Sequence, residues 1–455
     1  MSIKPQLTTF DTTMITVSLV IGIGIFRVPR MVASATGSRL LFFLAWALGG
    51  LVSLMGALTF AEIGSRFSKP GAFVKVVAES YHPAMAFMLN WAGLLFVQGA
   101  GAAAVAIIGA EHLTPLLLPP ALQGQTAVQV TAVALIVLLF GLNFLGIKTG
   151  AWAQNILTIL KVGMILALVL AALFYRGRSL GGGAPPPAVI PPASPWWLAL
   201  ALGFIPVFYS YGGYQCTINL GADVRGARKN MPRAILIGIL IIIACYLLIN
   251  LAYIRVLDIP GLAGEKLAAA RVAEVVFGRA GFLFVSLAIA LSALGFLNVT
   301  MIQIPRAYYA MAQDGALPAV FRKVNPRTQT QEFTLAFFTV TILLSVFLLG
   351  RFENIVNAVI FIDSLNIACV ASTIFWLRRK AAPEEEAGAV RAPLYPVLPA
   401  LFVLFLFGMS VNVLVNEPRN ALVGGAVLLM GLPVFLLMRS LGGKRGEEPL
   451  RPNRG

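Results

Sequence analysis

Histidine, cysteine and charged residues are all scarce in this sequence. The two histidines, His82 and His112, lack the spacing of metal ligands, and the three cysteines are widely separated within or beside apolar segments. Such cysteines are typical of small packing residues rather than of a disulfide or a metal set. Nothing resembles a nucleophile with its base, a metal cluster or a phosphate-binding loop. We therefore expect no enzyme activity, no metal and no cofactor.

Only 11% of the residues are charged, whereas 59% are hydrophobic and the mean hydropathy is +0.87. These values are typical of a polytopic membrane protein, because a soluble core does not bury a dozen apolar runs of about 20 residues each. The net charge of +16 comes from Lys and Arg in short loops between those runs. This pattern indicates a lipid bilayer as partner and no nucleic acid.

The apolar runs predict twelve membrane-spanning helices. Their approximate limits are 10–36, 39–64, 82–110, 124–146, 150–175, 196–222, 232–256, 280–312, 331–350, 354–378, 394–416 and 419–440. The N-terminus is not a cleavable signal, because its apolar run continues past Met31 without a small-residue cleavage site. Most clusters of Lys and Arg fall in the loops after spans 2, 6, 8 and 10 and in the tail, which predicts that both termini are cytoplasmic.

The stretch Ser18–Pro29 interrupts the first predicted span. Gly22 and Gly24 flank one isoleucine, and Pro29 follows five residues after the second glycine. Each glycine is roughly 1 kcal/mol less favourable than alanine within a helix. A backbone group freed inside a membrane is costly unless protein buries it or it lines a cavity. Taken alone, this stretch fits close packing of neighbouring helices as well as a polar ligand site.

A second break lies in the sixth predicted span, where Gly212 and Gly213 interrupt Phe208–Tyr214. Spans one and six are five apart, so they cross the membrane in opposite directions. Two such breaks in corresponding halves favour a transporter site between inverted repeats. We accordingly divide the chain into a first repeat (1–175), a second repeat (196–378), two additional helices (394–440) and a cytoplasmic tail (441–455).

The two ends of a broken helix complement the charges of a zwitterion. The start of one half carries partial positive charge and the end of the other carries partial negative charge. One site can thus hold the carboxylate and the ammonium of an amino acid without a charged side chain. The side chains near the breaks would sort substrates by size, although packing is the simpler interpretation for any single tyrosine; they are Ile23, Phe208, Tyr209, Tyr211 and Tyr214.

Lys161 and Glu62 are ionisable residues within predicted spans and call for an explanation, because charge is costly there. Lys161 is near the middle of span 5, where its side chain would struggle to reach the interface, so we favour a function in coupling over snorkelling. Glu62 is near the cytoplasmic end of span 2. We interpret it as structural and expect it to pair with a loop arginine.

Several stretches together resemble the amino acid–polyamine–organocation (APC) family of permeases. Val20–Phe26 resembles the glycine-rich break of the family's first span, and Pro305–Pro318 resembles the signature of its eighth span. Four further stretches are similar to family motifs: Thr59–Gly64, Lys69–Phe73, Asp223–Ile235 and Ala293–Asn298. The matches cover spans 1–8 in register.

The resemblance implies an all-α integral membrane protein with a LeuT-like fold of twelve transmembrane helices, including two inverted five-helix repeats whose first helices (spans 1 and 6) are broken. It implies that the backbone around Ile23 and Gly24 holds the substrate carboxylate, and that carbonyls around Val20, Ile21 and Phe208–Tyr211 hold the amine. Lys161 matches the span 5 lysine of sodium-independent members, which are similar to proton-coupled carriers or exchangers. The substrate-binding residues implied are Val20, Ile21, Gly22, Ile23, Gly24, Phe208, Tyr209, Ser210, Tyr211 and Gly212.

The sequence departs from the family pattern at two places. Ile23 stands where a small residue is usual, and its bulk is expected to narrow the site or to change which substrates fit. The paired acid after span 6 is reduced to Asp223, and the family's proline is Ala227 here, which puts the contacts of the inner gate in question.

We therefore expect secondary active transport of an amino acid across the plasma membrane by alternating access, sodium-independent and either proton-coupled or by exchange. The protein would lie in a bacterial inner membrane as a monomer or weak homo-oligomer, with an amino acid, protons and lipid as partners. A cationic amino acid or polyamine permease is the alternative, but it predicts an unpaired acid in the pocket, and we find none close to either break. A non-transporting amino acid sensor belongs to another class, and the short tail offers no signalling domain.

Overall fold

The computed structural model describes residues 3–22, 24–94, 98–177, 195–265, 267–278, 280–348, 353–380, 388–416 and 418–442. Within these ranges the regular structure is helical, with isolated β-bridges at Leu7–Val224 and Pro70–Leu220. The helices in chain order are α1 (Thr9–Val20), α2 (Gly24–Thr36), α3 (Arg39–Arg66), α4 (Ala72–Ser80), α5 (Pro83–Ala92), α6 (Gln98–Leu117), η2 (Pro120–Leu122), α7 (Gln125–Phe144), α8 (Ile147–Phe174), α9 (Trp196–Ser210), η3 (Tyr214–Asn219), α10 (Ala227–Gly264), α11 (Ala268–Phe277), α12 (Ala280–Gln313), η4 (Ala319–Arg322), α13 (Glu332–Leu348), α14 (Glu353–Lys380), α16 (Val397–Asn416) and α17 (Pro418–Gly442).

The chain is a multi-pass membrane protein. Among the described residues, eight helices are long and apolar enough to cross a membrane, and the bent pair α1 and α2 makes up to nine. The predicted third span, 82–110, is wrong at its end, because two helices occupy this region and α6 continues to Leu117. The full set of twelve spans stays a prediction.

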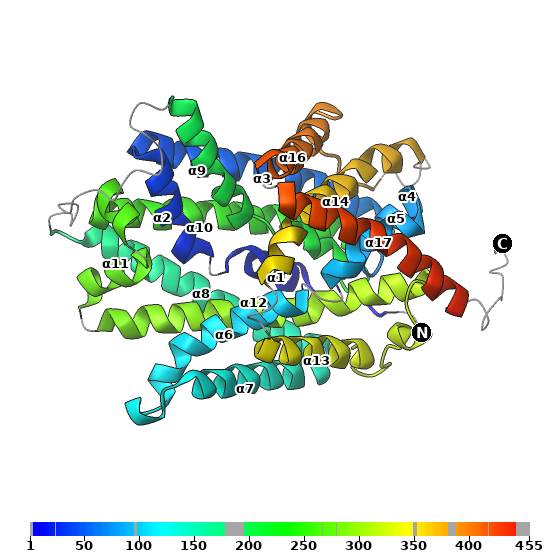
Figure 1. Ribbon diagram of the computed structural model, residues 1–455, viewed down its shortest axis with the longest axis horizontal. Helices are drawn as coiled ribbons and strands as arrows, with labels where there is room; N and C mark the ends of the chain where they lie inside the picture. The colour runs from blue at the N-terminus through cyan, green and yellow to red at the C-terminus, as the bar shows by residue number, and fades with distance from the viewer. Residues whose placement is uncertain are drawn as a thin grey trace.

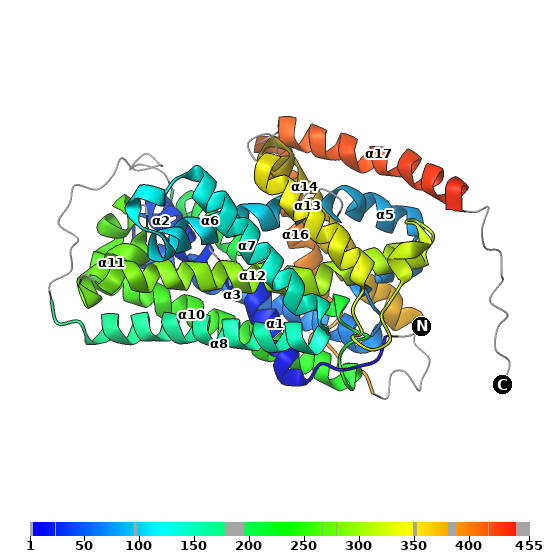
Figure 2. The same cartoon turned by 90° about the horizontal axis from the view of Figure 1, so that it is seen from below.

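The long helices α3, α8, α10 and α12 run along a common axis (Figures 1 and 2). α10 packs on α1 and α3, and α12 packs on α6 and α8. Helix α17 lies at the edge of the molecule against α5 (Figure 2). Leu429 of α17 and Leu404 of α16 are exposed, as expected of helices that face lipid.

Both predicted breaks are present in the backbone. Helix α1 ends at Val20 and α2 begins at Gly24, with a bend of 44° between the two helices. Helix α9 ends at Ser210, and a turn leads into the 3-10 helix η3 through Gly213, whose φ is +123°. A Cβ atom placed on Gly213 would lie 2.3 Å from the carbonyl oxygen of Leu19. The second break therefore packs directly against the end of α1.

We predict that Gly213→Ala destabilises the protein, because alanine resists a positive φ and its methyl group would push Leu19 away. The expected loss is about 1–3 kcal/mol of unfolding free energy, read as a lower melting temperature of the detergent-solubilised protein. Gly163→Ala on α8 is the matched control, since no neighbouring heavy atom lies within 4 Å of its Cβ position. Equal melting temperatures for the two variants would contradict the close contact at Gly213.

Candidate functional site

A cavity lies beside the second break, between α6, α9, η3, α12 and α14. It has two lobes of about 250 and 230 Å³. Five residues line both lobes, so we treat the two lobes as one cavity: Gln98, Tyr209, Cys216, Gln303 and Asp363. One lobe reaches the turn at Gly212 and Gly213, and we call it the break lobe. The other reaches Asn90 and Asn366, and we call it the amide lobe.

The predicted substrate residues fall into three groups. Those of the second break that line the cavity are Phe208, Tyr209, Tyr211 and Gly212, together with Tyr214 from the wider aromatic set. Leu19 of α1, which is not one of the predicted residues, also lines the cavity. Ile23 lies outside the described residues. The remaining predicted residues are described but do not line either lobe: Val20, Ile21, Gly22, Gly24 and Ser210.

Tyr246 of α10 joins the two breaks. Its hydroxyl lies 2.9 Å from the Ser210 carbonyl oxygen and 3.2 Å from the Val20 carbonyl oxygen, and its side chain is fully buried. Gly24, the first residue of α2, also lies close to the end of α9, because a Cβ placed on it would lie 3.3 Å from Ser210 Oγ. The structure thus brings the ends of α1 and α9 together, as the paired breaks predict. Sequence reasoning missed Tyr246, since nothing local distinguishes it from a packing aromatic.

Lys161 of α8 is buried, which excludes snorkelling. Its ammonium donates to the Ser18 hydroxyl at 2.9 Å and to the Ile21 carbonyl at 2.5 Å. Ile21 caps the end of α1, where the partial negative charge of the helix dipole lies. No carboxylate among the described residues pairs with this ammonium. A buried charge held only by neutral oxygens therefore clamps α8 to the first break.

A chain of buried amide side chains runs beside Lys161. Asn143 Nδ2 donates to Asn298 Oδ1 at 2.7 Å, and Asn298 Nδ2 donates to Gln154 Oε1 at 2.9 Å. Gln154 in turn donates to the Thr158 hydroxyl, which contacts the Met14 carbonyl. These bonds connect α7, α12, α8 and α1. Because polar partners are hard to exchange in an apolar core, they fix the register of these helices.

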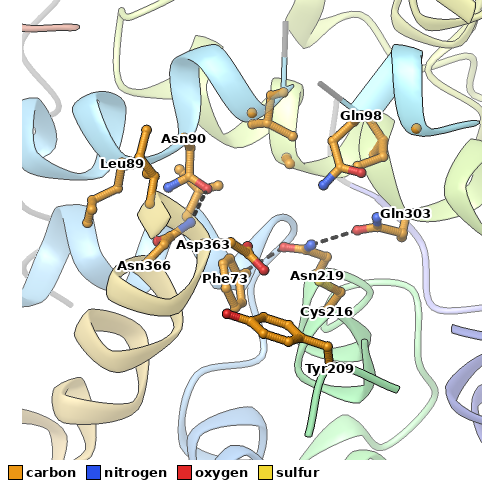
Figure 3. A pocket seen from close by; sticks show the side chains of 17 residues that line it. Phe73, Leu89, Asn90, Gln98, Tyr209, Cys216, Asn219, Gln303, Asp363 and Asn366 are labelled. Atoms are coloured by element: carbon orange, nitrogen blue, oxygen red, sulfur yellow. Dashed lines mark hydrogen bonds between the residues drawn. The ribbon is translucent and has the colours of Figure 1, made fainter. Parts of the chain in front are cut away.

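Among the described residues that line the cavity, Asp363 is the one with a charged side chain. It lies on α14 and is exposed to the cavity, and Figure 3 places it among Asn366, Asn219 and Tyr209. The expectation that no acid lies close to either break was therefore wrong. Helix α14 approaches the break from a distant part of the chain, and only the folded structure reveals this proximity.

Other carboxylates are paired at the end of the bundle where α3 and α14 finish. Glu62 is fully buried and accepts from Arg66, from Arg378 on both oxygens and from the Ala392 N–H, each at 2.7 Å. The predicted pairing with an arginine is confirmed, but Arg66 and Arg378 lie in the last turns of α3 and α14 and not in a loop. The Asp223 carboxylate accepts hydrogen bonds from both Nε and Nη2 of Arg306, each at 3.1 Å. One acid thus suffices for the contact that the sequence put in question.

Asp314, which follows the last residue of α12, pairs with Lys75 of α4. Burial raises the pKa of the Asp314 carboxyl above its usual value, although the neighbouring Lys75 ammonium opposes the shift. A carboxyl with a raised pKa takes up its proton earlier as the pH falls. This ion pair is therefore lost at a higher pH than one formed by an unperturbed aspartate.

Comparisons with known proteins give a consistent result. The family model described as amino acid permease matches residues 7–437. The chain is 27% identical over 429 residues to the serine/threonine exchanger SteT of Bacillus subtilis, covering 93% of this chain and 94% of that protein. It is 26% identical over 441 residues to the cystine/glutamate transporter of Homo sapiens, covering 96% and 85%. It is 25% identical over 440 residues to the human large neutral amino acids transporter small subunit 2, covering 96% and 81%.

We predict that Asp223→Asn strongly destabilises the fold, because it leaves the Arg306 guanidinium buried without its carboxylate. Breaking a buried pair costs about 3–5 kcal/mol, and the melting temperature should fall accordingly. The exposed pair between Lys69 and Glu79 provides the control, and Glu79→Gln should cost at most about 1 kcal/mol. In a double-mutant cycle, the variant that carries both Asp223→Asn and Arg306→Met should lose less unfolding free energy than the sum of the losses of the two single variants. Strict additivity would contradict the pairing.

Proposed function

Because this chain belongs to the amino acid permease family, of the APC superfamily, we propose that it carries an amino acid across the membrane by alternating access. The observation that supports this best is the meeting of two helix breaks beside a cavity. Gly213 packs on the Leu19 carbonyl, and Tyr246 spans the Ser210 and Val20 carbonyls. The named relatives exchange or transport amino acids, which supports the same class of substrate.

The substrate's α-amino and α-carboxylate groups are held by the two breaks. The residues proposed for this are Val20–Gly24 and Phe208–Gly212, whose freed N–H and C=O groups carry the partial charges of the helix ends. The Val20 and Ile21 carbonyls already accept from Tyr246 and Lys161. The Val20 carbonyl also accepts from the Gly22 N–H, so both of its lone pairs are used, whereas the Ile21 carbonyl keeps one lone pair for an ammonium. Four of the five residues proposed at the second break line the cavity, which gives the substrate access to this region.

Lys161 makes transport independent of sodium. Its ammonium already supplies a fixed positive charge at the carbonyl end of α1, where a bound metal cation would otherwise sit. When the ammonium gives up a proton, it loses the charge that holds the Ile21 carbonyl, and α1 is released from α8. This gives a route for proton coupling. The name of the SteT relative, an exchanger, favours exchange as the alternative mode.

The moving parts follow from the two proposed repeats. The bundle of predicted spans 1, 2, 6 and 7 rocks against the rest of the protein, and the helices within 394–440 lie outside the repeats at 1–175 and 196–378. In agreement with this division, α17 packs at the edge against α5 and α14. The protein lies in a bacterial inner membrane with both termini in the cytoplasm, where the basic loops also lie.

The test is uptake of radiolabelled amino acids into proteoliposomes loaded with the unlabelled amino acid, with and without sodium and with and without a pH gradient. We expect uptake without sodium, and a loss of about tenfold or more for Lys161→Ala, because a charge-assisted hydrogen bond contributes about 1.5–3 kcal/mol. Lys148→Ala, an exposed lysine on the same helix, should transport normally. Strict sodium dependence, or Lys161→Ala uptake with an unchanged rate and pH dependence, would refute the coupling role. Binding without flux in the unaltered protein would identify a sensor instead.

A further inference from the structure

We infer that this permease selects amino acids whose side chain ends in a second positive charge, an ammonium or a guanidinium, and that Asp363 is the specificity-determining residue. The inference rests on the proposed function, since it assumes that the α-amino and α-carboxylate groups are held at the breaks. It adds the chemistry of the remaining part of the substrate. Two independent features of the cavity carry it, an unpaired carboxylate and an unpaired amide oxygen.

The carboxylate of Asp363 is unpaired in a region where carboxylates are costly. It lies near the middle of the apolar helix α14, and no described residue forms an ion pair or hydrogen bond with it. The fully buried carboxylates Glu62 and Asp223 each have an arginine partner. Within a membrane an unpaired charge is kept where it faces a water-filled cavity and serves a function. Asp363 lines both lobes of the cavity.

The rest of the cavity wall supplies no competing cation. Among the described residues that line the two lobes, none is lysine, arginine or histidine. Lys161 donates to Ser18 and Ile21 and is not among the described lining residues. The negative charge of Asp363 is therefore not neutralised by any described residue of the cavity. The partner it lacks must come from the contents of the cavity.

Asn366, one helical turn from Asp363, adds a second acceptor to the same wall. Asn90 Nδ2 donates to the Ala86 carbonyl at 2.9 Å, so Asn90 presents its oxygen to Asn366. Asn366 Nδ2 donates to that oxygen at 2.9 Å. This fixes the amide orientation and leaves Asn366 Oδ1 as the free atom, and it is buried without a partner. The two residues thus offer two unpaired oxygen acceptors, and Asn366 also keeps its second Nδ2–H.

A substrate group that donates several hydrogen bonds would pair with both the Asp363 carboxylate and the Asn366 amide oxygen. A lysine ammonium has three N–H donors and a guanidinium has five, and neither accepts a hydrogen bond. A neutral apolar side chain would leave both acceptors unpaired, and an acidic side chain would be repelled by Asp363. Asp363 lines both lobes, so a substrate held at Gly212 in the break lobe can extend its side chain toward it. The geometry therefore favours lysine-like and arginine-like amino acids.

Pairs of ligands that differ only in charge test the inference. Binding to the purified full-length protein is measured by thermal shift and by competition with a labelled amino acid. L-lysine is compared with L-norleucine, and L-arginine with L-citrulline, which has a neutral ureido group. We expect each cationic ligand to bind about tenfold or more tightly than its neutral counterpart. Asp363→Asn should remove this preference while it changes norleucine binding by less than about twofold.

Two further variants guard against misfolding and against a general charge effect. Asp363→Glu keeps the charge and should keep the preference for cationic ligands, at reduced affinity. Glu79→Gln removes an acid outside the cavity and should behave like the unaltered protein. Equal loss of lysine and norleucine binding in Asp363→Asn would overturn the inference, because Asp363 would then hold the α-amine.

The same experiment separates failure of the inference from failure of the proposed function. If the unaltered protein binds norleucine and citrulline as tightly as lysine and arginine, the inference is wrong and the proposed transport of amino acids stands. If it binds and transports no amino acid at all, the proposed function fails and the inference fails with it.

Discussion

Backbone groups that are freed inside a membrane must find partners within the protein, and this constraint governs the centre of the molecule. Each break leaves carbonyl or amide groups outside the regular helix pattern, and water is absent from the surrounding hydrocarbon. The Ile21 carbonyl accepts from Lys161, the Val20 and Ser210 carbonyls lie against the Tyr246 hydroxyl, and the Gly213 N–H donates to Gln215. Side chains from α8 and α10 therefore complete the two broken helices. They stabilise the breaks, and the Ile21 carbonyl keeps a lone pair for a ligand.

This constraint also explains why the breaks are placed against long helices. Helix α10 carries Tyr246 and packs on α1 and α3, and α8 carries Lys161 and packs on α1 and α12. The amide chain from Asn143 to Thr158 fixes the register of these helices. A rigid frame is needed because a shift of one residue would remove the Lys161 ammonium from the Ile21 carbonyl. The irregular backbone of the site thus depends on regular helices around it.

The sequence predicts those parts of the structure that have a local signal. Paired glycines mark both breaks, and isolated charges in apolar runs indicate that Lys161 and Glu62 are buried with partners. Tyr246 and the amide chain could not be predicted, because their roles depend on contacts between residues far apart in the sequence. Asp363 is different, since an acid inside the predicted span 354–378 is itself a signal of function. It could have been found from sequence, although its place beside Gly212 and Tyr209 could not.

The separation of Lys161 from Asp363 is the feature that ties the proposed coupling to the proposed selectivity. If these two opposite charges met, they would neutralise each other, as Asp223 and Arg306 do. Instead Lys161 donates to neutral oxygens at the end of α1, and Asp363 lines the cavity. Neither charge has a partner of opposite sign among the residues that the structure describes. A substrate cation can satisfy Asp363 without displacing Lys161, so binding and release of a proton at α1 remain free to respond to transport.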